Sequence, residues 1–226
     1  MIKFWNECSR YGHVINVGIQ NTLAYRMNFM FRAVFTLIPL LANILLWKTI
    51  FSDKAEGDMV GTYNLSQMVS YYLLILIVNS MTAVNEDDWQ IAADIRNGVI
   101  SQFLLKPMDY LTFRFSLFLA NRLIYILVAT IPVGLFLLWQ RHYWTTPVSM
   151  EALMLSILSL CLTGLLQFLI SFTMALLAFW VLEVATFIFI LYAFEYIAGG
   201  HLFPLDLLPT WLETLLYWTP FPYLLS

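Results

Sequence analysis

The densest group of charged side chains in this sequence lies between residues 85 and 114, in a stretch that separates two long hydrophobic runs. Acidic and basic side chains at this spacing offer charge and hydrogen bonds to a partner, but the stretch pairs no nucleophile with an adjacent base. A chain that only crosses a bilayer needs no more than a short turn here. We therefore interpret this stretch as a structured surface for a soluble partner. Its acids come first and its bases follow: Glu86, Asp87, Asp88 and Asp94, then Arg96, Lys106 and Arg114.

Two further acids lie in strongly hydrophobic surroundings. Between Leu153 and Ala198 the charged residues are Glu183 and Glu195. A charged side chain in a membrane costs about 2.5–3.5 kcal/mol on insertion scales, so each such residue is a candidate for a transport pathway. For Glu183 the alternative is a structural role at a helix start, where the positive end of the helix suits a carboxylate. For Glu195 the alternative is pairing with a base of a partner chain.

Known catalytic and ligand-binding patterns are absent from the sequence. It has no G-x-S-x-G elbow, no Walker-type phosphate loop and no H-E-x-x-H helix. His13, His142 and His201 are far apart and form no metal-ligand cluster, and Cys8 and Cys161 are poorly placed for a disulfide. The net charge is -3 and the basic residues do not gather into the face that a nucleic-acid binder needs. We expect no catalytic residue, no directly bound cofactor and no metal.

The composition indicates a membrane protein. The chain is 61% hydrophobic and only 11% charged, whereas soluble domains carry about 25% charged residues. A helix needs about 20 apolar residues to cross the hydrocarbon core. The sequence therefore predicts an all-α polytopic membrane protein, with a tight turn separating the last two spans near residues 179–183. The expected spans are 33–51, 65–84, 115–139, 153–180 and 181–198.

The first 22 residues are interpreted as an amphipathic helix that lies in the membrane interface. Apolar side chains recur at helical spacing at Phe4, Cys8, Tyr11, Ile15 and Ile19, and polar residues fall between them. A signal peptide would need a continuous apolar stretch, which this segment lacks.

The distribution of Lys and Arg predicts the orientation, because cytoplasmic loops carry more of them. We therefore place the N-terminus and residues 85–114 in the cytoplasm and residues 199–226 outside. We expect the bases from Arg96 to Arg114 to anchor the third span at the membrane surface, and Arg122 to extend its side chain to that surface. One side has Lys3, Arg10, Arg26, Arg32, Arg96, Lys106 and Arg114, and the other has Lys48, Lys54 and Arg141.

The last segment, 199–226, is apolar but interrupted by prolines. Proline removes a backbone donor and clashes with the preceding turn, so a continuous sixth span is not expected here. We predict two short helices that enter the outer leaflet and return, the second at 211–218 with Thr210 as its cap. The prolines are Pro204, Pro209, Pro220 and Pro222.

Two motifs resemble those of ABC-2-type transporter permeases. IRNGVIS at 95–101, followed by LLKP at 104–107, is similar to the cytoplasmic loop of that family. GGHLFPL at 199–205, with the prolines that follow it, is similar to the family's outer motif. With the N-terminal helix, the resemblance extends over nearly the whole chain and is greatest to bacterial export permeases of the multidrug type.

The resemblance implies an ABC-2-type transmembrane domain in the bacterial inner membrane that exports a substrate. Two such permease subunits, identical or paralogous, would sit on ATPase subunits that bind ATP and Mg. The segment 4–19 would be the elbow helix, and a coupling helix within 85–98 would rest on the ATPase. The implied coupling residues are Glu86, Asp87, Asp88, Arg96 and Gly98, and the implied outer re-entrant motif contains Gly199, Gly200, Pro204, Pro209 and Pro220.

One feature departs from the family pattern. Family members have six spans, and this sequence ends at Ser226 before a sixth, so either the sequence is a fragment or the gene is shortened. Two other functions stay open. A secondary transporter would be expected to show an internal repeat, and we find none. A non-transporting membrane scaffold has the same composition as a permease.

Overall fold

The structure is a computed structural model that describes residues 2–24, 26–52, 59–83, 87–106, 108–143, 149–181 and 183–225. It is 83% helical, and the described residues form no strand, so the predicted all-α fold is confirmed. The α-helices are α1 (Ile2–Ala24), α2 (Arg26–Ser52), α3 (Leu65–Thr82), α4 (Asp87–Arg96), α5 (Ile100–Leu104), α6 (Tyr110–Trp139), α7 (Met150–Ala175), α8 (Ala185–Ala198) and α9 (Thr210–Leu216). Short 3-10 helices are η1 (Arg141–Tyr143), η2 (Leu176–Phe179), η3 (Leu205–Leu207) and η4 (Pro222–Leu224).

Four helices of the described chain are long and apolar enough to cross a membrane. A continuous helix satisfies its own backbone hydrogen bonds, which is the condition for lying in lipid. Large apolar side chains such as Leu127 and Ile131 on α6 point outward, as expected for a lipid-facing surface. The four helices are Met27–Ser52, Leu65–Thr82, Tyr110–Trp139 and Met150–Phe179.

The fifth predicted span differs from the others. In place of a helix over 181–198, the structure has α8, which begins at Ala185 and has 14 residues. A helix of that length covers about 21 Å, whereas the hydrocarbon core is about 30 Å thick. The break after η2 lies where the sequence predicts a tight turn, near residues 179–183, but α8 begins four residues later than the predicted span.

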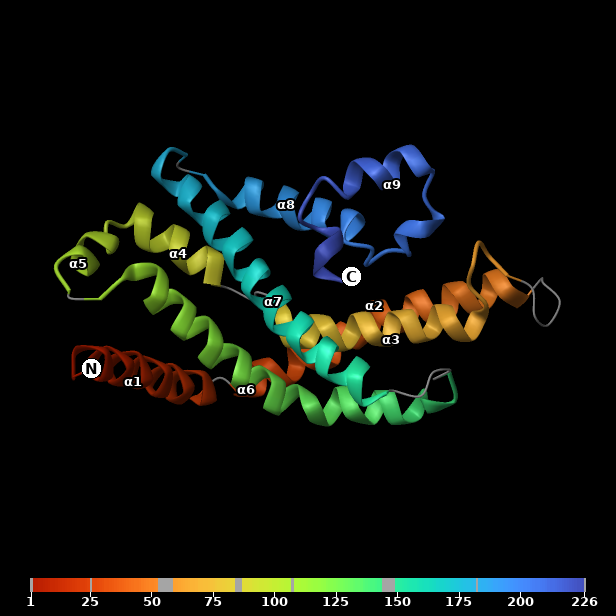
Figure 1. The fold of residues 1–226 in the computed structure, drawn as a ribbon, viewed down its shortest axis with the longest axis horizontal. Helices are drawn as coiled ribbons and strands as arrows, with labels where there is room; N and C mark the ends of the chain where they lie inside the picture. Colours follow the sequence, from red (N-terminus) through yellow and green to blue (C-terminus); the bar gives the residue numbers. More distant parts are fainter. Residues whose placement is uncertain are drawn as a thin grey trace.

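Helix α1 packs along the first half of α6 (Figure 1). The two helices run in the same direction: the Asp109 backbone N–H donates to the Tyr11 hydroxyl (3.3 Å), and the Thr22 hydroxyl donates to the side-chain amide oxygen of Asn121 (2.6 Å). Gly18 permits the close approach between them, since an added Cβ would lie 2.9 Å from the Ala120 Cβ. Part of the amphipathic helix therefore contacts protein, in addition to the membrane interface that its pattern predicts.

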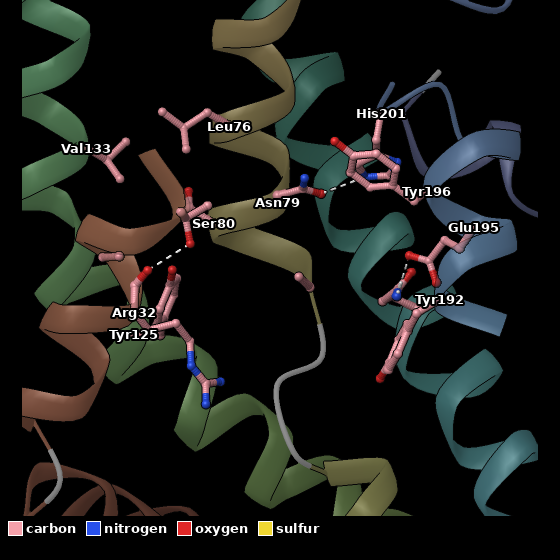
Figure 2. Close-up of a pocket in the computed structure, with 14 residues that line it drawn as sticks. Arg32, Leu76, Asn79, Ser80, Tyr125, Val133, Tyr192, Glu195, Tyr196 and His201 are labelled. Carbon is pink, nitrogen blue, oxygen red and sulfur yellow. Dashed lines mark hydrogen bonds between the residues drawn. The ribbon is translucent and has the colours of Figure 1, made fainter. Parts of the chain in front are cut away.

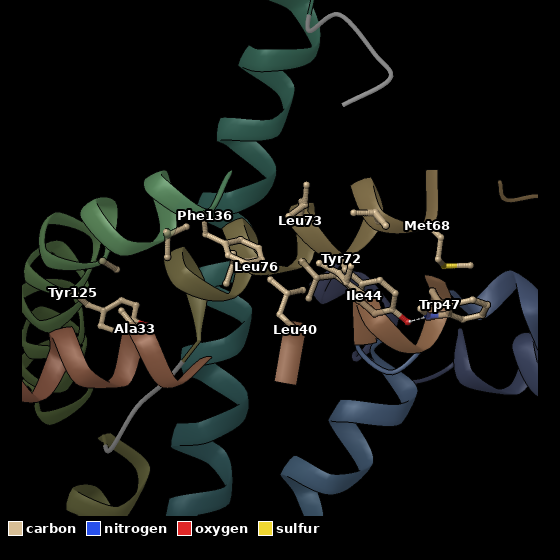
Figure 3. Packing of buried hydrophobic residues seen from close by; sticks show 14 residues of the cluster. Ala33, Leu40, Ile44, Trp47, Met68, Tyr72, Leu73, Leu76, Tyr125 and Phe136 are labelled. Atoms are coloured by element: carbon tan, nitrogen blue, oxygen red, sulfur yellow. Dashed lines mark hydrogen bonds between the residues drawn. The ribbon is translucent and has the colours of Figure 1, made fainter. Parts of the chain in front are cut away.

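The largest core lies between α2, α3 and α6, where α2 and α3 run side by side (Figures 1 and 3). Ile44 of α2 and Met68 and Leu73 of α3 are almost fully buried in it. The indole N–H of Trp47 donates to the Tyr72 hydroxyl across 2.8 Å. Buried Trp and Tyr need such partners for their polar atoms. The contact joins α2 to α3 near the end that is opposite α4.

The segment after α8 consists of short pieces, as the prolines predict. Pro204 precedes η3, Pro209 precedes α9 and Pro222 begins η4. Helix α9 begins at Thr210, so this residue is the first of the helix and not its cap as predicted. Its apolar side chains pack in a third cluster, which holds the segment against α7 and α8.

Candidate functional site

Helix α4 is held against the rest of the chain by its apolar face. Ile91 and Ile95 are buried among aromatic side chains of α6 and α7, chiefly Phe118, Phe168 and Phe172. The spacing of the two isoleucines places them on one side of the helix. This face fixes which of the charged residues of α4 point inward.

Asp94 and Arg114 join α4 to α6. The Arg114 side chain is only 6% exposed and forms an ion pair with Asp94. Its Nε donates to the Tyr110 hydroxyl (3.0 Å), which in turn donates to Asp94 (2.9 Å). Charge-assisted hydrogen bonds of this kind are the strong ones. The sequence predicts Arg114 as an anchor at the membrane surface, but the structure uses it to hold α4.

Asp88 is buried, which corrects the prediction that it contacts a partner directly. It is 1% exposed, and its carboxylate accepts hydrogen bonds from the Tyr192 hydroxyl of α8 and from the Trp89 backbone N–H. Burial raises the pKa of the Asp88 carboxyl, and these two hydrogen bonds oppose that shift. The physical reason is the helical period: Asp88 lies one and two turns before Ile91 and Ile95, on the same buried face.

The opposite face of α4 is exposed. Trp89 is 43% exposed, and Arg96 and Gly98 are exposed at the end of the helix. Gly98 has a φ of +71° and no atom within 4 Å of an added Cβ, so the turn after α4 requires its backbone conformation and not its small size. Glu86 and the Asp87 side chain lie outside the described part of the chain.

Glu183 is exposed and lies beside α4. It lines a cavity of about 180 Å³ together with Trp89 and Arg96. The predicted pathway pair, Glu183 and Glu195, therefore lines two different cavities. In this conformation Glu183 belongs with the exposed face of α4.

Glu195 lines a larger cavity of about 360 Å³ (Figure 2). Its walls come from α2, α3, α6, α7, α8 and the residue His201. The Gln167 side-chain amide donates to one carboxylate oxygen of Glu195 across 2.9 Å. The other oxygen is buried and has no hydrogen-bond partner among the described residues. The cavity therefore contains a hydrogen-bond acceptor, the second Glu195 oxygen, that a bound ligand could use.

Tyr192 connects this cavity to α4. It lines the cavity, and its hydroxyl donates to Asp88. Tyr192, Glu195 and Tyr196 lie three and four residues apart, so they share one side of α8. The side chain of Tyr192 thus links α4 directly to the lining of the cavity.

The outer motif is tied to α3 by hydrogen bonds. The Tyr71 hydroxyl donates to the Gly200 carbonyl and the Tyr72 hydroxyl to the Leu202 carbonyl, each at 2.6 Å. The Nε2 atom of His201 lies 3.0 Å from the side-chain amide oxygen of Asn79. Before α3, the Tyr63 hydroxyl donates to Asp206 at 2.9 Å, and burial together with this carboxylate raises the pKa of Tyr63 to about 12.

Gly199 and Gly200 are required by this close packing. An added Cβ on Gly199 would lie 2.7 Å from the Glu195 carbonyl oxygen, and one on Gly200 would lie 2.7 Å from the Tyr71 hydroxyl. Gly200 also has a φ of +83°, which strains other residues. Among the predicted motif residues, Pro204 is buried, whereas Pro209 and Pro220 are exposed.

Arg122 is buried, so the expected extension to the membrane surface is wrong. Its guanidinium lies over the rings of Phe118 (5.7 Å) and Tyr125 (5.3 Å) and donates to the Ser80 carbonyl (3.4 Å) near the end of α3. Cation–π contacts and a helix C-terminus both stabilise a desolvated cation.

Sequence reasoning missed several polar residues that meet in space. Tyr192, Gln167 and Asn79 lie in hydrophobic runs and line the cavity, and Tyr71 and Tyr72 hold the outer motif. The available signal was the presence of amide and hydroxyl groups in membrane helices, where such side chains seek partners. That signal does not say which partners they find.

A family model described as an ABC-2 family transporter protein matches residues 37–225. The chain belongs to the ABC-2 transporter family. The resemblance drawn from the two motifs is thereby confirmed. With its long apolar helices, this ABC-2 chain is a multi-pass membrane protein and a membrane subunit of a transporter. No curated protein and no solved structure matches the chain.

Proposed function

We propose that this ABC-2 chain is the permease subunit of an ATP-driven exporter, in which a partner ABC ATPase acts on α4. The observation that supports this most is the attachment of α4 to three other helices. It packs on α6 and α7 through Ile91 and Ile95, pairs with α6 through Asp94, and bonds to α8 through Asp88.

The packing explains how force on α4 would reach the membrane helices. Protein interiors are close-packed, so a buried helix moves with its neighbours or loses its contacts. Closure of an ATPase dimer would displace α4, and α6, α7 and α8 would follow as a rigid body. The Tyr192 contact would carry the displacement to the cavity that contains Glu195.

The exposed side of α4 has the chemistry of a protein interface. Trp and Arg are the residue types that contribute most to protein interfaces, and Trp89 and Arg96 are both exposed here. Leu105, just after α5, is 89% exposed, and Lys106 beside it is exposed too. These four residues form the docking face that we propose for the ATPase.

The partner would bind ATP and Mg, and this chain would supply the pathway without a catalytic residue or a bound cofactor. A second permease subunit, identical or paralogous, would complete the pathway. The excess of Lys and Arg near α1 and α4 supports a cytoplasmic N-terminus in a bacterial inner membrane. The cavity with an acid in hydrophobic surroundings favours transport over a scaffold role.

The docking face is tested with a pair of charge reversals. The chain is co-expressed with an ABC ATPase encoded in its genomic neighbourhood and purified through a tag on the permease. Arg96→Glu should lower the recovered ATPase by about tenfold, as expected for loss of an interface hot spot. Arg141→Glu, at the opposite end of the molecule, should not. Equal recovery with both variants would contradict the proposed docking face.

A further inference from the structure

We infer that the cavity beside Glu195 binds a lipophilic organic cation, and that such a cation is the cargo class of the transporter. This inference rests on the proposed function for its transport step, but not for the binding itself. The cavity combines a carboxylate, aromatic rings and apolar walls. Together these are the features that recognise an ammonium-type or phosphonium-type ligand.

The carboxylate supplies the charge. One Glu195 oxygen accepts from Gln167, and the other is buried without a hydrogen-bond partner in the described structure. A buried acceptor without a partner costs free energy, which a bound cation would recover. Neutral Gln167 does not balance an ionised carboxylate, whereas a bound cation would.

The aromatic rings lie where a cation near Glu195 would meet them. Tyr192 and Tyr196 are on the same side of α8 as Glu195, and Figure 2 shows the Tyr196 ring above the Glu195 carboxylate, beside His201, and the Tyr192 ring below it. The Tyr196 ring stacks on His201, with centroids 5.7 Å apart, which fixes its orientation. Faces of aromatic rings attract cations, most strongly when water is excluded.

The other charged residue of the lining is Arg32 of α2. Figure 2 shows its guanidinium on the opposite side of the cavity from Glu195, near Tyr125. The cavity therefore has separate electropositive and electronegative ends, and a cation is favoured only at the Glu195 end. An anion of similar size would meet the unpartnered carboxylate there and be repelled.

The size and the walls indicate a lipophilic ligand. A volume of about 360 Å³ lies at the lower end of the range of about 300–1,000 Å³ that small-molecule sites occupy. Ala33, Leu76 and Val133 supply apolar surface to the cavity lining. A hydrated metal ion would leave this surface without a matching group, whereas an organic cation with apolar substituents covers it.

The test compares two probes of nearly equal size and opposite charge. Radiolabelled tetraphenylphosphonium and tetraphenylborate are bound to the full chain in lipid nanodiscs, with empty nanodiscs as the blank. The phosphonium should bind saturably and at least tenfold more tightly than the borate, since a ligand that fills the cavity contacts the Glu195 carboxylate. Glu195→Gln should weaken phosphonium binding by about tenfold or more, because a charged hydrogen-bonding or ion-pairing group in a desolvated site is lost. Glu195→Asp, which keeps the charge, should retain most of the binding.

The control is Glu151→Gln, which makes the same chemical change at an exposed site at the start of α7. It should bind like the unaltered chain. Thermal unfolding of each variant shows whether it is folded, and if Glu195→Gln is not, the comparison of the two probes on the unaltered chain still tests the site. Equal binding of both probes, or undiminished phosphonium binding in Glu195→Gln, would overturn the cation site. Because the ATPase is absent from this experiment, such a result would leave the docking face on α4 untouched, and failure of the co-purification test would leave the cation site untouched.

Discussion

Single side chains decide how α4 is attached to the membrane helices. Asp94 and Arg114 are both largely removed from water, with side chains 20% and 6% exposed. A buried charge that loses its partner keeps the cost of its desolvation, so removal of one member is far more damaging than replacement of both. Tyr110 shares the contact and orients both groups.

Asp94→Asn should therefore destabilise the chain by roughly 2–4 kcal/mol, slightly less than a fully buried pair, since Asp94 retains some solvent contact. Thermal unfolding in detergent, followed by tryptophan fluorescence, measures the loss. The double variant Asp94→Leu/Arg114→Met should be more stable than the sum of its two single variants predicts. Strict additivity of the three measurements would mean that the two residues do not depend on each other.

Tyr192 has a different role from the Asp94–Arg114 pair. Its hydroxyl donates to Asp88 on α4, and it also lines the cavity of Glu195. Asp88, which the sequence predicts as a contact for the ATPase, therefore links α4 to α8 inside the protein. This is consistent with coupling in which the ATPase touches the exposed face of α4 and the cavity responds through the buried face.

The elements to which we assign a function are short, and neighbouring helices hold them in place. Helix α4 has 10 residues and α9 has 7, and isolated helices of these lengths are unstable in water. The segment between α8 and α9 depends on hydrogen bonds to Tyr71 and Tyr72 of α3. Its shape therefore responds to any movement of α3 relative to α8.

Gly200→Ala tests this attachment. A left-handed backbone costs a residue with a Cβ about 1–2 kcal/mol, and here the Cβ would also press on the Tyr71 hydroxyl. We expect a loss of about 1–3 kcal/mol in unfolding free energy. Gly134→Ala, inside α6 with no atom within 4 Å of the new Cβ, should be neutral or slightly stabilising. A similar result for both variants would show that the outer motif does not constrain Gly200.

The whole molecule is elongated, with different chemistry at its two ends. Figure 1 shows α1, α4 and α5 gathered at one end, and the last turns of α2 and α6 with the first turns of α3 and α7 at the other. The long helices between them have outward apolar surfaces. An orientation with α4 in the cytoplasm gives a soluble ATPase access to Trp89 and Arg96.

Cysteine labelling tests that orientation. Asn97 and Thr210 are both exposed, so a cysteine at either position should be reactive. In a background in which Cys8 and Cys161 are replaced by alanine, a membrane-impermeant maleimide should label Thr210→Cys in intact cells. Asn97→Cys should react only after the membrane is permeabilised. The reverse pattern would show the opposite orientation in the membrane, with α4 outside the cell, where a cytoplasmic ATPase could not contact it.

Much of the architecture follows from the sequence because a membrane restricts the choices. Long apolar runs have to be helical to satisfy their backbone in lipid, which gives α2, α3, α6 and α7. Several prolines close together prevent one long helix, so the short pieces after residue 199 were predictable, whereas the single prolines Pro39 and Pro132 lie inside α2 and α6. The two motifs were enough to predict the ABC-2 family.

The positions of the buried polar side chains could not be predicted from the sequence. Asp88, Arg114 and Arg122 look like surface charges in the sequence, and the structure buries all three. The length of α8 and the joint lining of one cavity by Glu195 and His201 were equally hidden. Each of the three charged residues meets a partner on another helix: Asp88 meets Tyr192, Arg114 meets Asp94, and Arg122 meets the Ser80 carbonyl. Hydrophobicity and helical period describe a segment alone, whereas the free energy of a buried polar group depends on the group that tertiary packing brings to it.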